Sequence, residues 1–292
     1  MLQYLAPEQF AVFDLETLRT CAFHYGDDEF VLDDGTRAFS FDRTSKSRGW
    51  LRRLAPEGWQ RGTAVGSLRA TETAAWLALV GAFARGGWLE WLTDIDVGLV
   101  AENKLGQLEA AQGLGIDSPR TVVTNDLDRL SSTFAEPWLV KALGPAHFYD
   151  QNGGHVVFGQ SVTRADLGGL GTSPPMLFQE LLPARHHLRV VCVGDNVWCG
   201  CLNADGLPVD WRSDNDAHDS FRMIDTPTDV ETGARRMNDA LGIRYSSQDW
   251  IVTQDRSVLI DVNPNGQWLF LPEPIATEVS KSIASWLSGR DV

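Results

Sequence analysis

The chain has 292 residues, of which 43% are hydrophobic and 11 are tryptophan, so we expect one large or two modest domains with a substantial core. Its formal net charge of −14 argues against a general nucleic-acid or anionic-membrane binder, because phosphate groups select lysine and arginine. A basic peptide is an easier partner to imagine. No apolar run approaches the ~18 residues of a membrane-spanning helix, and the first residues lack a signal-peptide pattern, so we expect a soluble cytoplasmic protein.

The four cysteines, Cys21, Cys192, Cys199 and Cys201, form no Cys-x-x-Cys pair, and no set of histidines and cysteines has the spacing of a zinc site. Free cysteine is among the residue types that proteins bury most often. We therefore expect four reduced thiols in the core or in strands.

Two local patterns stand out in the N-terminal third of the chain. Residues 29–32 and 36–41 flank the turn at residues 33–35, whose Asp-Gly pair supplies the positive φ angles that tight hairpin turns require. Apolar residues recur at helical spacing over residues 71–85, and Gly86 ends the pattern. These patterns predict a hairpin followed by a long helix.

The middle of the chain begins with a helix expected over residues 101–112, which Gly113 ends, and continues with short apolar runs typical of strands. A polar segment with Gly153 and Gly154 lies between two of these runs. It is either a flexible flap over phosphates or an ordinary hairpin loop, because it lacks the spacing of a phosphate-binding P-loop. The expected strands are residues 121–124, 138–143, 156–158, 176–180, 188–193 and 197–202, the last two joined by a Gly-Asp turn.

Two helices are expected near the C-terminus. Thr226 and Pro227 open the first, which runs to residue 241, because a hydroxyl caps free backbone N–H groups and proline lacks the N–H that would be unpaired there. The second has a helical stripe of four apolar residues, Ile275, Val279, Ile283 and Trp286.

Between these helices, residues 250–253 and 258–260 predict an antiparallel hairpin. Side chains alternate faces along a strand, so Asp261 and Asn263 point the same way, and Asp249 joins them if the loop has an odd length. Two carboxylates and an amide oxygen are the ligands that Mg²⁺ prefers. The alternative is a solvated hairpin face with scattered acidic residues.

Five segments then follow one another along the chain. They are AENKLGQLEAAQGLGIDSPRTVVTND, WLVKAL, LFQELLPARHHLRVVCVGDNVWCGCL, DWR and LGIRYSSQDWIVTQDRSVLIDVNPNGQWLFLP. In this order they resemble the ATP-grasp superfamily, and within it the peptide maturases that include the microviridin-type graspetide ligases. The signature of that branch is an acidic residue, normally Glu, then a hydrophobic residue and Asn-Pro-x-Gly-Gln-Trp, which here is residues 261–268 with aspartate first.

The resemblance covers residues 48–275, including residues 50–53, which are similar to the family's Trp-x-Arg-Arg segment. It implies an α/β fold with α+β elements, in which two α+β subdomains hold ATP between them. The implied domains are an N-terminal pre-ATP-grasp-like domain at 1–98, a central subdomain with a phosphate flap at 99–183, and a C-terminal subdomain with the Mg²⁺ site at 184–292.

The resemblance also assigns nucleotide contacts. Lys104 and Lys141, two of only four lysines, match the family's phosphate-binding lysines, and a compact ammonium suits a flexible polyphosphate. The alternatives are a helix-surface lysine for Lys104 and an ordinary strand lysine for Lys141. Gln179 and Glu180 match the hinge between the subdomains, where backbone groups read adenine whatever the side chain is.

Two arginines are the implied catalytic residues. Arg189 matches the clamp on the γ-phosphate or acyl phosphate, because a guanidinium binds phosphate through two parallel hydrogen bonds. A surface ion pair is its alternative. Arg212, in Asp-Trp-Arg, matches a residue that orients the acceptor carboxylate. For Arg52 and Arg53 the sequence favours no catalytic role.

Three functions remain open at this point. The resemblance implies a ligase that uses ATP and Mg²⁺ to activate carboxylates of a ribosomal precursor peptide, docked through its leader segment, and to form ester or amide crosslinks. The alternatives are a carboxylate-amine ligase for an amino acid or dipeptide, and a non-catalytic binding module. A homodimer is left open, and neither nucleic acid nor membrane is an expected partner.

Overall fold

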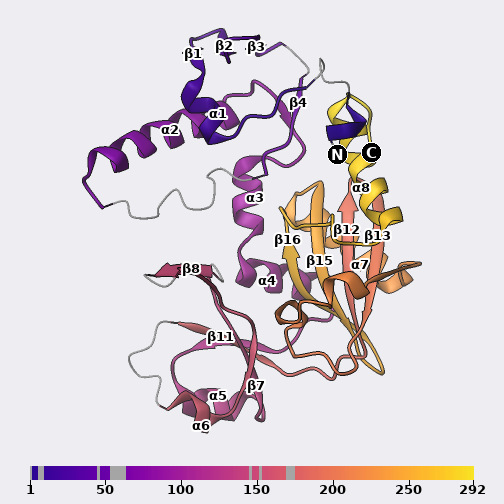
Figure 1. Ribbon diagram of the computed structural model, residues 1–292. Coiled ribbons are helices and arrows are strands. Elements are labelled where there is room, and N and C mark those ends of the chain that lie inside the picture. Colours follow the sequence, from indigo (N-terminus) through magenta and orange to yellow (C-terminus); the bar gives the residue numbers. More distant parts are fainter. Residues whose placement is uncertain are drawn as a thin grey trace.

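The computed structural model describes residues 2–5, 10–44, 47–52, 64–144, 147–150, 153–168 and 175–292. Figure 1 shows three regions, with the N-terminal part at the top, a four-stranded sheet below it, and a five-stranded sheet beside both. The chain ends lie close together, next to the last helix (Figure 1). Among the described residues, no helix is both long and apolar enough to cross a bilayer.

The N-terminal part combines a three-stranded meander with a long helix. The predicted hairpin and helix are confirmed, because β2 pairs antiparallel with β3 and one helix spans the whole predicted range. Phe30 and Leu32 of the meander are buried together with Trp88 beyond the helix, which forms a small core of its own. The elements are η1 (Leu2–Tyr4), α1 (Leu15–Thr20), β1 (Ala22–Tyr25), β2 (Glu29–Asp33), β3 (Ala38–Asp42), β4 (Arg48–Gly49), α2 (Leu68–Arg85), β5 (Glu90–Trp91) and α3 (Ile95–Ala101).

The central part is a four-stranded sheet in the order β10-β7-β11-β6 with a separate hairpin, β8 and β9, above it. Leu130, Trp138 and Phe178 fill the core between the sheet and its short helices. The elements are α4 (Lys104–Leu114), β6 (Thr121–Thr124), α5 (Leu127–Thr133), β7 (Trp138–Lys141), β8 (His147–Asp150), β9 (Gly153–Val156), β10 (Gln160–Val162), α6 (Arg164–Leu167) and β11 (Met176–Glu180).

The C-terminal part is a five-stranded antiparallel sheet in the order β14-β13-β12-β15-β16. Alternate residues of its strands fill two cores, because successive side chains point to opposite faces. Val191 and Val193 pack with α8, whereas Val190 and Cys192 pack with α7. The elements are β12 (His186–Val193), β13 (Asn196–Asn203), η3 (Trp211–Ser213), η4 (His218–Ser220), β14 (Arg222–Ile224), α7 (Thr228–Leu241), β15 (Tyr245–Val252), β16 (Ser257–Asn263) and α8 (Glu273–Leu287).

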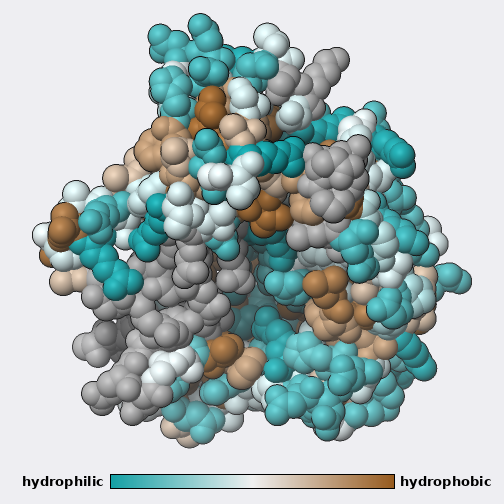
Figure 2. Space-filling model, turned by 45° about the horizontal axis from the view of Figure 1, so that its top comes forward, coloured by the Kyte–Doolittle hydropathy of each residue, from teal (hydrophilic) through white to brown (hydrophobic). Residues whose placement is uncertain are grey.

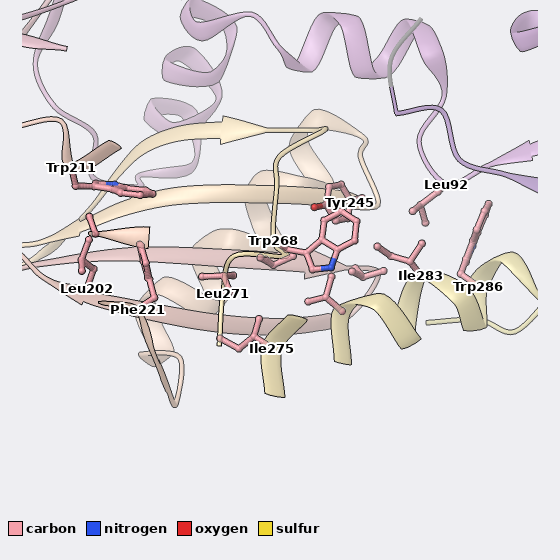
Figure 3. Close-up of a cluster of buried hydrophobic side chains, with 14 residues drawn as sticks. Leu92, Leu202, Trp211, Phe221, Tyr245, Trp268, Leu271, Ile275, Ile283 and Trp286 are labelled. Carbon is pink, nitrogen blue, oxygen red and sulfur yellow. The ribbon is translucent and has the colours of Figure 1, made fainter. Parts of the chain in front are cut away.

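Figure 3 shows the core on the α8 side of this sheet. Ile275, Ile283 and Trp286 come from the helix, and Tyr245 and Trp268 lie between the helix and the strands. All four residues of the predicted apolar stripe of α8 are buried. The helical spacing therefore correctly predicts one buried, apolar face of this helix.

Several boundaries differ from the sequence expectation. The helix expected at 101–112 begins at Lys104, because the Asn103 side chain accepts hydrogen bonds from the N–H groups of residues 105 and 106 and starts a new helix after α3. Gly113 stays helical, and Gly115, at φ 66°, ends the helix. The strand expected at 138–143 ends at Lys141, and 156–158 is replaced by β9 and β10. In α7 the N-cap residue is Pro227, so Thr226 is not the cap.

The cysteine prediction is confirmed, since all four are buried free thiols. Burial raises the pKa of Cys192 and of Cys199 to about 12. These thiols are therefore protonated and unreactive at neutral pH, because the thiolate is the nucleophile.

Candidate active site

Two adjoining cavities, of about 240 and 80 Å³, lie between the four-stranded and the five-stranded sheet, and together they are called the cleft below. Figure 2 shows a hollow on one face of the molecule, with hydrophilic residues on its visible floor and hydrophobic residues along parts of its rim. The six residues that line both cavities are Lys141, Gly159, Gln179, Arg212, Asp249 and Ile260. Most of the residues expected at the site therefore meet in one place.

The expected oxygen ligands lie on one pair of strands. Asp249 of β15 is directly opposite Asp261 of β16, and Asn263 is two residues further along the same strand. Both carboxylates line the smaller cavity. Two carboxylates and an amide oxygen are hard donors that fit Mg²⁺. Among the described residues no group of three or more His, Cys, Asp or Glu side chains is placed to hold a metal ion, so the Mg²⁺ site remains a prediction.

Arg189 holds one of these carboxylates. Its Nη1 donates to Asp249 Oδ1 at 2.8 Å, and its Nη2 donates to the carbonyl oxygen of Gln267 at 3.1 Å. The side chain is 10% exposed, and Arg189 is absent from the lining of both cavities. In this arrangement Arg189 positions Asp249 and the loop after β16, and the phosphate clamp remains a prediction for it.

The two lysines converge from different elements. Lys104, the first residue of α4, donates from Nζ to the carbonyl oxygen of Ala142 at 3.2 Å, directly after Lys141 in β7. Burial, together with the charges of Lys104 and Arg212, lowers the pKa of Lys141 to about 8. The carboxylates of Asp261 and Asp249 partly oppose this shift. A bound polyanion would offset the burial and the like charges that lower this pKa.

Arg212 is the arginine that reaches the cleft. It binds Asp210 through two hydrogen bonds, Nε to Oδ1 at 2.8 Å and Nη2 to Oδ2 at 2.7 Å. These bonds raise the pKa of Arg212, and the charges of Asp249 and Asp261 raise it further. Asp210 also accepts a hydrogen bond from the N–H of Gly159 at 2.8 Å, which links the end of the β8–β9 hairpin region to the C-terminal part.

The expected hinge lies at the larger cavity. Gln179 is 3% exposed, and its Nε2 donates to Thr121 Oγ1 at 2.9 Å. Glu180 accepts hydrogen bonds from the backbone and the side chain of Arg120. Burial raises the pKa of Glu180, but these bonds and the charges of Arg120 and Arg256 together lower it. The N–H of Glu180 donates to the Arg120 carbonyl, so the chain that continues along the cavity, Leu181 and Leu182, presents the next backbone groups.

The loop after β16 is clamped through two successive carbonyl groups. The Gly266 carbonyl accepts from Tyr245 Oη at 2.6 Å and from Arg52 Nη1 at 3.4 Å, and the Gln267 carbonyl accepts from Arg189. The Arg52 guanidinium also lies 4.8 Å from the ring centre of Trp50. Arg52 therefore helps to hold this loop, a role that the sequence alone did not indicate. Arg53 lies outside the described residues.

Three further residues lie at the cleft, although the sequence did not single them out as site residues. Gly159 has no motif around it, and His187 and Gln107 sit in strand and helix patterns that look ordinary. His187 lines the larger cavity, and burial lowers its pKa, so its imidazole is neutral near pH 7. Gln107 lines the smaller cavity, and only its spacing of three residues from Lys104 on one helix could have pointed to it.

No protein-family model matches the chain, and no curated protein matches it significantly. Solved structures do match. A RiPP-associated ATP-grasp ligase from Chryseobacterium gregarium, in complex with ADP and a leader and core peptide, is 23% identical with a TM-score of 0.80, over 92% of this chain and 84% of that chain. The chain therefore has the ATP-grasp fold.

Two more ATP-grasp structures agree along nearly the whole length. Macrocyclase MdnC from Microcystis aeruginosa MRC, bound with precursor peptide MdnA, is 24% identical with a TM-score of 0.78, over 94% of this chain and 89% of that chain. ATP-grasp ligase PsnB, complexed with minimal precursor, Mg and ADP, is 15% identical with a TM-score of 0.67, over 92% of this chain and 84% of that chain. The predicted α/β fold with two α+β subdomains is confirmed, while the domain limits stay a prediction, and the limit at 98/99 falls inside α3.

Proposed function

We propose that this protein is an ATP-dependent ligase that activates side-chain carboxylates of a ribosomal precursor peptide and forms ester or amide crosslinks within that peptide. The observation that carries the proposal is the convergence of Lys104, Lys141 and Arg212 with Asp249 and Asp261 in one cleft of an ATP-grasp fold. In a chain of net charge −14, three cations gathered at one cleft beside a pair of carboxylates suit a nucleotide polyphosphate together with Mg²⁺.

The proposed reaction has two steps. A peptide carboxylate attacks the γ-phosphorus of ATP, the bond to the β-phosphate oxygen breaks, and an acyl phosphate and ADP result. A hydroxyl or amine of the same peptide then attacks the acyl carbon, loses its proton and displaces phosphate. No covalent bond to the enzyme forms, so positioning and charge neutralisation supply the catalysis.

The residue roles follow from where each side chain lies. Lys104 and Lys141 neutralise phosphate oxygens, and Arg212, fixed by Asp210, orients the peptide carboxylate and its acyl phosphate. The hinge at Gln179 and Glu180 binds adenine through the backbone.

Mg²⁺, when bound, would be held by three oxygen donors and would offset phosphate charge. Arg189 keeps the first of these donors in place through its ion pair. The three donors are Asp249, Asp261 and Asn263.

A peptide substrate is supported by the extent of the structural match. The C. gregarium ligase and MdnC are each in complex with peptide, and the match to both covers more than nine-tenths of this chain. The N-terminal part is thus included, which a nucleotide site alone would not require. We place the reaction in the cytoplasm, where ribosomal peptides and ATP meet.

The test is turnover with a candidate precursor, namely a peptide encoded next to this gene with repeated Ser or Thr and Asp or Glu in its C-terminal half. We expect ADP and phosphate release only with that peptide, and each linkage lowers its mass by one water. Release with free amino acids alone would instead indicate the amino-acid or dipeptide ligase. Absence of Mg²⁺-dependent ATP binding would indicate a non-catalytic module.

A further inference from the structure

The side-chain amide of Gln107 forms hydrogen bonds to the backbone of β16, the strand that carries Asp261 and Asn263. Its Nε2 donates to the carbonyl oxygen of Val262 at 2.6 Å, and its Oε1 accepts from the N–H of Val262 at 3.0 Å. A third bond runs from Nε2 to the carbonyl oxygen of Ala101 at 2.7 Å. The Gln107 residue is 5% exposed, so these bonds form away from water.

These hydrogen bonds matter because of where β16 lies in the sheet. Within the part of the chain that the structure describes, β16 is an edge strand of the five-stranded sheet and pairs only with β15. The backbone groups of alternate residues on an edge strand have no strand partner, and such edges are easily displaced. Gln107 pairs these groups at Val262, the one residue between Asp261 and Asn263, and so acts as a substitute for a neighbouring strand.

Val262 is fixed on a second side as well. Its side chain is 2% exposed in the core that α4 and α7 share with the sheet. Because successive side chains point to opposite faces, burying Val262 in this core turns Asp261 and Asn263 to the other face. Three residues before Gln107, on the same helix, Lys104 reaches the end of β7. One helix therefore sets where the phosphate-binding lysine lies relative to the metal strand.

We infer that Gln107 is a positioning residue of the metal site: by holding Val262 it fixes the spacing and direction of the Asp261 and Asn263 ligands. The inference rests on the proposed function, which makes these two residues Mg²⁺ ligands. Residues that orient metal ligands without binding the metal themselves commonly contribute about 10-fold to 100-fold in metal affinity. Both ends of the Gln107 amide are taken up by backbone groups, so it acts through the ligands.

The test compares Gln107→Met with the unaltered full-length protein. Methionine has a similar length and volume but can neither donate to nor accept from Val262 in this way. ADP binding is measured by calorimetry over a range of Mg²⁺ concentrations. We expect the Mg²⁺ concentration for half-maximal binding to rise about tenfold, with ADP affinity in the absence of Mg²⁺ changed less than about twofold.

A second readout needs no nucleotide. Hydrogen–deuterium exchange at the Val262 amide should accelerate in Gln107→Met, because its acceptor is gone. A Gln107→Glu variant should bind Mg²⁺ poorly at pH 8 and recover toward pH 6, relative to the unaltered protein at the same pH, because a protonated carboxyl can again donate to Val262. A structural role alone would not produce this recovery.

Leu130→Ala serves as the matched control for lost stability. Leu130 is fully buried in the core of the four-stranded sheet, away from β16, so its loss destabilises the protein without touching the metal strand. An unchanged Mg²⁺ dependence in Gln107→Met, or an equal shift in Leu130→Ala, would overturn the inference. If the unaltered protein shows no Mg²⁺-dependent ADP binding, the proposed function fails instead.

Discussion

Asp249 and Asp261 face each other across β15 and β16 only because the pairing of these strands shifts by one residue beside them. Trp250 pairs with Leu259, yet Asp249 pairs with Asp261, so Ile260 is an extra residue on β16. Trp250 and Leu259 lie in the core with α7. In a regular strand without this shift, Ile260 would pair with Asp249, and Asp261 would pair with Gln248 and share the face of Leu259, because residues two apart point the same way. The bulge turns the carboxylate to the cleft.

The first prediction concerns the length of the Asp261 side chain. Asp261→Glu introduces the residue that is normal in the signature resembled by residues 261–268. The longer carboxylate reaches the metal from the same strand, so Mg²⁺-dependent phosphate release should be kept or raised. Asp261→Ala should lower it by about 100-fold or more, because a ligand to the phosphate-neutralising metal is lost. Phosphate release is measured during a Mg²⁺ titration. A loss in Asp261→Glu as large as in Asp261→Ala would show that the metal assignment is wrong.

The second prediction follows from the lowered pKa of Lys141, about 8 against an ordinary 10.5, which burial causes. Between these two values the unfolded chain holds more protons than the folded one, so the free energy of unfolding rises with pH over this window. Lys141→Met should stabilise the nucleotide-free protein at pH 7 by at most about 3 kcal/mol, and the gain should fade from pH 8 to 10.5.

Urea unfolding of both proteins at pH 7 and at pH 10 measures this difference. In the same experiment series, ATP affinity of the unaltered protein should fall as pH rises through 8, because the neutral amine no longer attracts phosphate. A pH-independent gain in Lys141→Met would contradict the assigned titration.

The bulge also explains how far the sequence could predict this site. Alternation along β16 correctly places Asp261 and Asn263 on one face. The sequence places Asp249 opposite them only if the loop has an odd length, and the loop between Val252 and Ser257 has four residues. The pairing was right and its reason was wrong, since bulges have no reliable signal in one sequence. The ATP-grasp fold was predictable because several motifs occur in order.

Contacts between distant segments could not be predicted. Ser246 and Gln248 are polar residues of a buried strand, and Asn238 of α7 accepts a hydrogen bond from each, at 2.6 and 3.1 Å. Arg52 likewise reaches a carbonyl 214 residues further along the chain. Periodicity reports which face is buried, and it says nothing of which polar group will be the partner.

The third prediction separates Arg212 from an ordinary ion pair. Arg212→Lys removes the two-point bond to Asp210, which a lysine cannot make, so kcat should fall at least about tenfold while the KM for ATP changes little. The control is Arg85→Lys, because Arg85 also binds a carboxylate through two points, that of Asp96, but lies outside the cleft. Equal kcat losses in both variants would remove the case for Arg212.

The fourth prediction tests the clamp on the loop after β16. A Cβ at Gly266 would lie 2.4 Å from Ser247 Cβ and 3.0 Å from Arg189 Nη2, so Gly266→Ala must push the loop off β15 and displace the arginine that holds Asp249. We expect a loss of about 1–3 kcal/mol in the free energy of unfolding, together with weaker Mg²⁺ dependence of ADP binding.

The matched control is Gly113→Ala, because Gly113 lies in the last turn of α4 and a Cβ there has no atom within 4 Å. This variant should stabilise the protein by about 0.5–1 kcal/mol, since alanine favours helix more than glycine does. Urea unfolding and calorimetry on both variants give the two free energies and the two Mg²⁺ titrations. If Gly266→Ala unfolds like the unaltered protein and keeps its Mg²⁺ dependence, the loop is not held as described, and Arg189 does not depend on it to position Asp249.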